Sequence, residues 1–211
     1  MGNSTNKTAE YLLQIKAIKL QPSNPFTWAS GWKSPIYCDN RKTLSFPEVR
    51  SYIRDSFSSL ITELYPNVEL IAGVATGAIA HGALVADKLE LPFIYVRSGA
   101  KEHGLGNQIE GYFKTGQKVV VIEDLISTGG SSLSAVRALR DAGCEVLGMV
   151  AIFTYGFNKA TEGFAVENCK LDTLSNYQVL IESALKSEYI GQSDVETLKK
   201  WRVDPSTWSG I

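Results

Sequence analysis

Residues 119–131 read VVVIEDLISTGGS, and this stretch decides the fold. Four apolar residues are followed at once by two carboxylates, Glu123 and Asp124. A run of Ser, Thr and paired Gly comes next, and a helical pattern over 131–142 follows it directly. This order predicts a buried strand over 118–122, with the acids at its carboxyl end, then a tight loop and a helix N-terminus.

The loop and the acids suit different chemical groups. In an open parallel sheet, ligands bind at the carboxyl ends of strands, and exposed backbone N–H groups at a helix start favour a phosphate. Like charges repel, so Glu123 and Asp124 are better placed to accept hydrogen bonds from sugar hydroxyls or to hold a cation. The stretch therefore predicts a site for a phosphorylated ribose. Two other phosphate loops, G-x-x-x-x-G-K-[ST] and a G-x-G-x-x-G after a strand, are absent from the sequence.

The composition predicts a soluble protein of a single domain spanning 1–211. The chain is 44% apolar and 20% charged, as in ordinary globular proteins. A net charge of -1 argues against a nucleic-acid partner. No apolar stretch approaches the ~20 residues that span a bilayer, and the start of the chain lacks a signal-peptide core. Its three cysteines are far apart, as expected in a reducing compartment. We therefore expect a cytoplasmic protein without a membrane partner.

Strand and helix patterns alternate through the middle of the chain, which predicts an α/β fold with a mostly parallel sheet flanked by helices. The expected helices cover residues 8–20, 47–65, 78–88, 131–142, 177–185 and 195–201, the last two lying over the sheet. The expected strands cover residues 69–72, 93–96, 118–122 and 145–153, with short strands and turns over 26–45. Trp201, Trp208 and His81 are interpreted as packing residues.

A polar, glycine-rich loop over 97–112 separates two of these strands. It holds three potential cations, Arg97, Lys101 and His103. Long loops in compact domains are often functional lids, and these cations suit a polyanion such as pyrophosphate. Closure of such a loop would keep water from a reactive intermediate.

Three segments together resemble orotate phosphoribosyltransferases, members of the type I phosphoribosyltransferase family. The stretch 119–131 matches the family motif for phosphoribosyl pyrophosphate (PRPP). Arg97, Lys101 and His103 with the segment 108–111 match its flexible loop, and residues 26–41 resemble its orotate-binding hood.

The resemblance implies the type I fold, with a hood over about 20–46 and a core over about 66–155. It implies transfer of the phosphoribosyl group from PRPP to orotate, with release of pyrophosphate. The cofactor would be Mg²⁺, held mainly by PRPP and water rather than directly by the protein. The enzyme would be a homodimer in which the 97–112 loop acts on the partner's site.

Individual roles follow from the same resemblance. Lys101 and His103 would neutralise the leaving pyrophosphate, while Glu123 and Asp124 would orient the ribose hydroxyls and offset the developing positive charge. Substrate contacts are expected from the loop, the motif and the hood, at Arg97, Lys101, His103, Glu123, Asp124, Leu125, Ile126, Ser127, Thr128, Gly129, Gly130, Ser131, Lys33 and Tyr37.

Four positions depart from patterns found in the family, and these are Ser98, Ala29, Gly77 and residues 154–156. At the last of them, the arginine expected for the orotate carboxylate is missing. Arg41 and Lys33 are candidates to replace it.

Two other readings stay open at this point. One is a purine phosphoribosyltransferase of the same fold, against which the hood and the Lys101/His103 loop argue. The other is a PRPP sensor without activity, such as a repressor. A repressor would need an added DNA-binding domain or a basic face, and neither is evident in the sequence.

Overall fold

A computed structural model describes residues 2–28, 30–97 and 108–209. Its elements up to the first sheet strand are α1 (Gly2–Gln14), β1 (Ile18–Leu20), β2 (Phe26–Thr27), β3 (Lys33–Ser34), β4 (Ile36–Cys38), the 3₁₀ helix η1 (Asn40–Ser45), α2 (Pro47–Leu64) and β5 (Leu70–Val74). The remaining elements are α3 (Ile79–Leu89), β6 (Phe93–Val96), β7 (Ile109–Glu110), β8 (Lys118–Ile126), α4 (Gly130–Asp141), β9 (Glu145–Thr154), α5 (Asn158–Val166), β10 (Leu171–Asn176), α6 (Tyr177–Lys186) and α7 (Gln192–Val203). Within these ranges, no helix combines the length and apolar character needed to cross a membrane.

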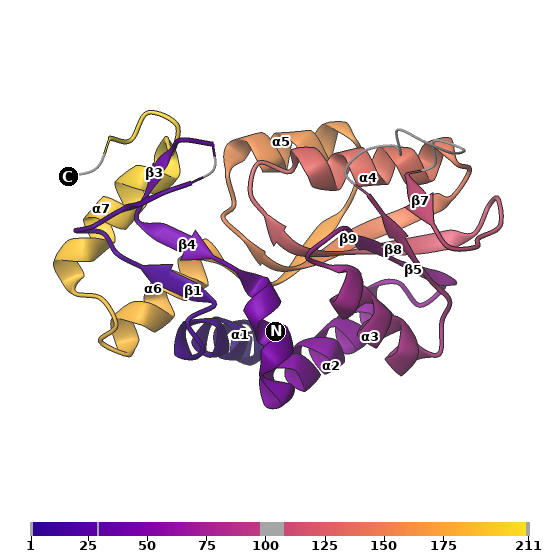
Figure 1. Ribbon diagram of the computed structural model, residues 1–211, viewed down its shortest axis with the longest axis horizontal. Helices are drawn as coiled ribbons and strands as arrows, with labels where there is room; N and C mark the ends of the chain where they lie inside the picture. Colours follow the sequence, from indigo (N-terminus) through magenta and orange to yellow (C-terminus); the bar gives the residue numbers. More distant parts are fainter. Residues whose placement is uncertain (1, 29, 98–107, 210–211) are drawn as a thin grey trace.

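A six-stranded sheet in the order β10-β9-β8-β5-β6-β7 forms the centre, and only the β6–β7 pair is antiparallel. Alternate residues of β8 face opposite sides. Val119 and Val121 join the apolar cluster that includes α4, whereas Val120 and Ile122 join the cluster that includes α2 and α3. Helices α4 and α5 cover one face, and α2 and α3 cover the other (Figure 1). The α/β architecture predicted from the sequence is confirmed.

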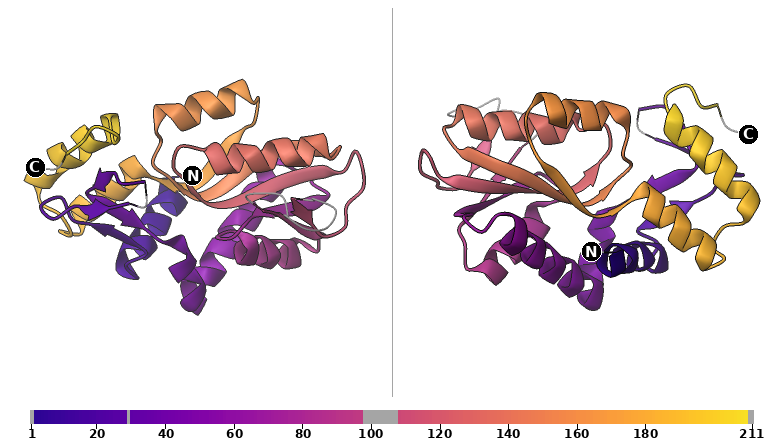
Figure 2. Two further views of the ribbon diagram at one scale, coloured as in Figure 1. Left: turned by 45° about the horizontal axis from the view of Figure 1, so that its top comes forward. Right: turned by 180° about the vertical axis from the view of Figure 1, so that it is seen from behind.

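The short strands β1 to β4 form a separate lobe beside the sheet, in which β1 pairs with β4 and β2 pairs with β3. Helices α6 and α7 lie beside these strands rather than over the sheet, as both Figure 1 and Figure 2 show. The expectation that the C-terminal helices cover the sheet is therefore wrong. The lobe combines the N-terminal strands with the C-terminal helices.

Some predicted boundaries differ from the observed ones. The first helix ends at Gln14, because Lys16 adopts a positive φ of 54°, and Ile18–Leu20 forms a strand instead. The motif strand does not stop at residue 122 but continues through both acids to Ile126, since its pairing with β9 extends that far. The sequence pattern also did not predict β7, α5 and β10.

Trp201 joins the two lobes. Its fully buried ring lies 5.6 Å from Trp28 of the small lobe and 5.7 Å from Tyr155, which follows β9. Its Nε1–H donates to the carbonyl oxygen of Lys33 at 3.3 Å. The assignment of Trp201 to packing is confirmed.

Replacement of Trp201 by Ala should lower the free energy of unfolding by about 3–5 kcal/mol, because the large buried side chain leaves a cavity between the lobes. Denaturant unfolding followed by circular dichroism measures this loss. Val203, which is 85% exposed on the same helix, provides the control, and V203A should leave stability unchanged. An equal, small effect of both changes would contradict the role of Trp201.

Candidate functional site

Glu123 and Asp124 are neighbours in β8 but have different surroundings. The Glu123 side chain is 4% exposed, and its Oε2 accepts a hydrogen bond of 2.9 Å from Ser132 Oγ at the start of α4. Its Oε1 accepts from the backbone N–H of Asp124, also at 2.9 Å. Asp124 itself stays partly exposed. In this arrangement Asp124 is the acid that a ligand can reach. The buried Glu123 holds the backbone of Asp124 through the hydrogen bond to its N–H.

Burial separates the two acids further. It raises the pKa of Glu123 well above the ordinary carboxyl range, and the adjacent charge of Asp124 raises it more. Burial also raises the pKa of Asp124, although the hydrogen bond with Glu123 and the charge of Arg41 act in the opposite direction. Two adjacent desolvated carboxyls titrate as a pair. When the pair holds a single proton, we place that proton on Glu123 and the negative charge on Asp124.

The loop after β8 presents backbone N–H groups at the start of α4. Gly129 has a φ of +80°, which favours glycine, and a Cβ there would lie 3.2 Å from the Phe164 ring of α5, a tight contact. Ser127 and Thr128 are partly exposed before it, and Ser131 is exposed after it. The first N–H groups of a helix lack partners within the helix. Such N–H groups are available to an anion, as the predicted phosphate subsite requires.

The turn after β5 approaches the same acid. A Cβ built on Gly77 would overlap the carboxyl of Asp124. Any larger side chain here would displace that carboxyl, which gives a physical reason for glycine at one of the four departures noted in the sequence. The turn itself is held by a hydrogen bond of 2.8 Å from Ala75 N to Val96 O, at the end of β6.

A buried chain of polar groups connects the small lobe to the acids. Asn40 Nδ2 donates to the backbone carbonyl of Asp124 at 2.6 Å. Thr43 Oγ1 donates to the carbonyl of Asn40 at 2.5 Å and lies 3.1 Å from His81 Nε2 of α3. Burial lowers the pKa of His81 to about 4, so the ring is neutral at physiological pH. His81 is structural, as expected, but the role of Asn40 was not predicted from the sequence.

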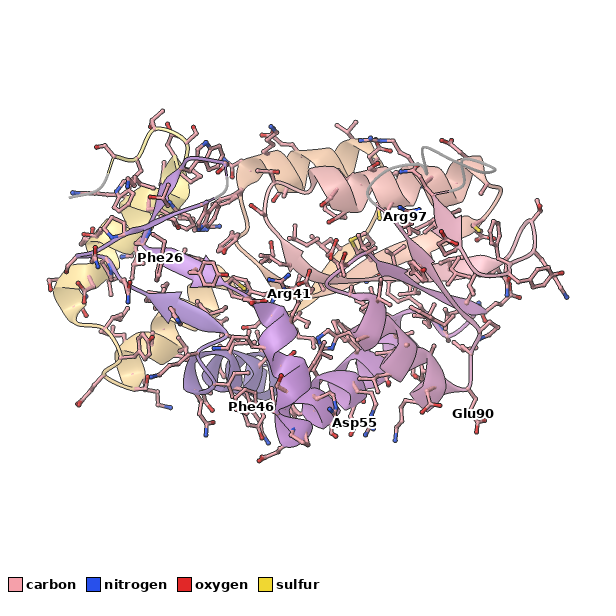
Figure 3. All side chains as sticks on the ribbon, viewed as in Figure 1. Phe26, Arg41, Phe46, Asp55, Glu90 and Arg97 are labelled. Atoms are coloured by element: carbon pink, nitrogen blue, oxygen red, sulfur yellow. The ribbon has the colours of Figure 1, made fainter. Side chains whose placement is uncertain are left out.

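The expected hood residues lie at different places in the small lobe. Tyr37 is 40% exposed, with its ring 5.6 Å from that of Phe26. Arg41 lies where the small lobe meets the sheet, as Figure 3 shows, and its Nε donates to Asp39 Oδ1 at 2.7 Å. Lys33 is exposed in the β2–β3 hairpin, and its Nζ donates to Thr27 Oγ1 at 2.8 Å. Of these side chains, Arg41 is the one whose charge acts on Asp124.

The loop residues are described only at their edges. Arg97 directly follows β6, and its Nη1 lies 3.6 Å from Glu110 Oε1. Because β6, β5 and β8 are parallel, Arg97 lies at the same sheet edge as the acids. Lys101 and His103 lie outside the described residues, as do Ser98 and Ala29.

The side chains of Leu125 and Ile126 belong to packing. Ile126 is fully buried, and Leu125 packs against the core. Any ligand contact from Ile126 must therefore come from its backbone. The structure thus brings together Asp124, Arg41 and the loop 127–131, whereas Lys33 projects from a separate hairpin.

Comparisons with known proteins match these features. The family model for the phosphoribosyl transferase domain matches residues 45–183. An orotate phosphoribosyltransferase of Phocaeicola vulgatus is 62% identical over 200 residues, covering 95% of this chain and 94% of that protein. One from Listeria innocua is 58% identical over 202 residues, covering 96% and 97% respectively. The crystal structure of orotate phosphoribosyltransferase from Aeropyrum pernix aligns with a TM-score of 0.75 and 28% identity, covering 87% of this chain and 99% of that one.

Replacement of Glu123 by Gln should stabilise the protein more at pH 8 than at pH 5. The raised pKa means that folded Glu123 keeps its proton to a higher pH than in the unfolded chain. Its contribution to stability is therefore full below the unfolded pKa and falls as the pH rises through the folded one. Gln cannot ionise, so it avoids this loss.

Thermal unfolding of wild type, E123Q and the control E145Q at both pH values measures the effect. Glu145 is exposed at the start of β9, so E145Q should show no such pH dependence. The prediction is wrong if E123Q differs from wild type by the same amount at pH 5 and pH 8.

Proposed function

The chain belongs to the orotate phosphoribosyltransferases, a family of glycosyltransferases with the type I phosphoribosyltransferase fold, and we infer that it converts orotate and PRPP to orotidine 5′-monophosphate and pyrophosphate in pyrimidine biosynthesis. The observation that carries this inference is the pairing of an open carboxylate, Asp124, with a glycine-shaped anion loop at the same strand end. A phosphorylated ribose presents matching groups, hydroxyls and a phosphate.

The described residues support a mechanism based on positioning and charge. Departure of pyrophosphate leaves positive charge on the ribose ring, as in other glycosyl transfers. Asp124 would accept hydrogen bonds from the ribose hydroxyls and stabilise that charge. Glu123, holding the proton of the pair, would keep Asp124 oriented. The backbone N–H groups of 127–131 would bind the 5-phosphate, and no side-chain nucleophile is required.

Mg²⁺ fits the donors at this site. Among residues 2–28, 30–97 and 108–209, no three His, Cys, Asp or Glu side chains gather around one point. Mg²⁺ is commonly bound through one or two carboxylates together with substrate phosphates and water, and Asp124 is a carboxylate of this kind. The ion would neutralise the oxygens of the pyrophosphate as the bond to it breaks.

The loop cations would act on the pyrophosphate in a cytoplasmic homodimer. Arg97 is 37% exposed and lies 3.6 Å from Glu110, a loose ion pair that a ligand can replace. Lys101 and His103 would extend from the same loop across to the partner's site. Lys101 would neutralise the leaving group, and His103 would donate a proton.

Orotate absorbance should fall when both PRPP and Mg²⁺ are present and stay flat when either is omitted. D124N should reduce turnover at least ~100-fold, because it removes the charge that stabilises the transition state.

Adenine, hypoxanthine and uracil serve as alternative bases in the same absorbance assay. Consumption of a purine would replace the proposed substrate, and PRPP binding without any turnover would indicate a sensor.

Mixing of two inactive variants tests the shared site. K101A removes the loop cation and D124N removes the acid, so each homodimer should be inactive. A heterodimer that exchanges loops carries one intact site, and random mixing should restore about a quarter of wild-type activity. If the mixture stays inactive after subunit exchange has been verified by mass spectrometry, each loop serves its own subunit.

A further inference from the structure

A cavity lies next to the 127–131 loop, where the two lobes meet. It measures about 290 Å³, and its lining includes Thr128 of the loop, Trp32 of the small lobe, and Asn158 and Lys159 at the start of α5. Arg202 of α7 lines the opposite part. The cavity therefore combines the phosphoribosyl motif, the small lobe and two cationic side chains.

The Arg202 side chain is fixed by the turn after β9. Its Nε donates to the carbonyl of Tyr155 and its Nη2 to that of Gly156, each at 3.0 Å. Gly156 has a φ of +67°, and a Cβ there would lie 2.9 Å from Nη2. The turn therefore needs glycine for its backbone conformation and for the close approach of Arg202.

This anchoring leaves most of the guanidinium available. Two of its five N–H donors are used, and among the described residues no carboxylate forms an ion pair with it. The other two candidate cations are engaged, since Arg41 pairs with Asp39 and Lys33 bonds to Thr27. A fixed, planar and always charged guanidinium suits a bidentate pair with a planar carboxylate.

We propose that Arg202, with Lys159 beside it, binds the carboxylate of orotate and so sets the preference for orotate over uracil. This inference rests on the proposed function. The phosphate of the substrate is a second anion of similar chemistry, but it already has a subsite at the N–H groups of 127–131. Arg202 of α7 contacts the turn at Tyr155 and Gly156. This turn lies within residues 154–156, where the arginine expected for the orotate carboxylate is missing.

The nucleotide pair orotidine 5′-monophosphate and uridine 5′-monophosphate isolates the carboxylate, because the two differ only in that group. Their inhibition constants are measured for wild type, R202A and K159A, after turnover of orotate by wild type is established. In R202A the constant for orotidine 5′-monophosphate should rise roughly 10- to 100-fold, as expected for a lost charged hydrogen bond. The constant for uridine 5′-monophosphate should stay unchanged. K159A, which leaves both anchoring carbonyls intact, should show a smaller change with the same selectivity.

Three results would overturn the proposal. An equal rise for both nucleotides would assign Arg202 to the phosphate. Unchanged constants for both would remove it from binding, and an equal rise with a lowered melting temperature would reduce it to a structural clamp. K200A removes an exposed charge from the same helix, and should alter neither constant. Absence of orotate turnover in wild type would count against the proposed function instead.

Discussion

The partly buried hydrogen bond from Asn40 to the carbonyl of Asp124 holds the small lobe against β8. Strand β5 pairs with β8 only as far as Ile122, so beyond that point the 3₁₀ helix takes over the contact. Because the buried Asn40 amide would be costly to leave without a partner, this bond fixes the lobe at one distance from the acids. The position of Tyr37 and Arg41 relative to Asp124 depends on it.

Adjacent carboxyls in one strand acquire different properties because a strand turns successive side chains to opposite sides. Glu123 points beneath α4 and is desolvated, whereas Asp124 points toward the small lobe and the Gly77 turn. The sequence places two carboxyls side by side. The fold buries Glu123 beside Ser132, and this burial raises the pKa of Glu123 and so favours its uncharged form. One negative charge, on Asp124, then remains partly exposed.

The sequence alone was sufficient for the layers of the central sheet and for the turn that follows its motif strand, because both depend on local patterns. The apolar run before Glu123 and the glycines after it specify a strand end and a tight turn without any tertiary information. Ile18 was misassigned to a helix because Leu12, Ile15 and Ile18 lie at helical spacing, whereas the helix ends at Gln14 and Ile18 begins a strand. The break at Lys16 is a backbone conformation that its residue type does not announce.

The contributions of Asn40 and Arg202 could not be foreseen, since each acts across a long separation in the chain. Asn40 meets Asp124 across 84 positions, and Arg202 meets Gly156 across 46. Pairings of this kind depend on how the lobes dock, which periodicity and motif spacing do not encode.

The uncharged state of His81 has one further consequence for the enzyme. With a pKa of about 4, the His81 imidazole that contacts Thr43 of η1 carries no charge over the range of intracellular pH. Acidification within that range therefore adds no charge at this contact between η1 and α3.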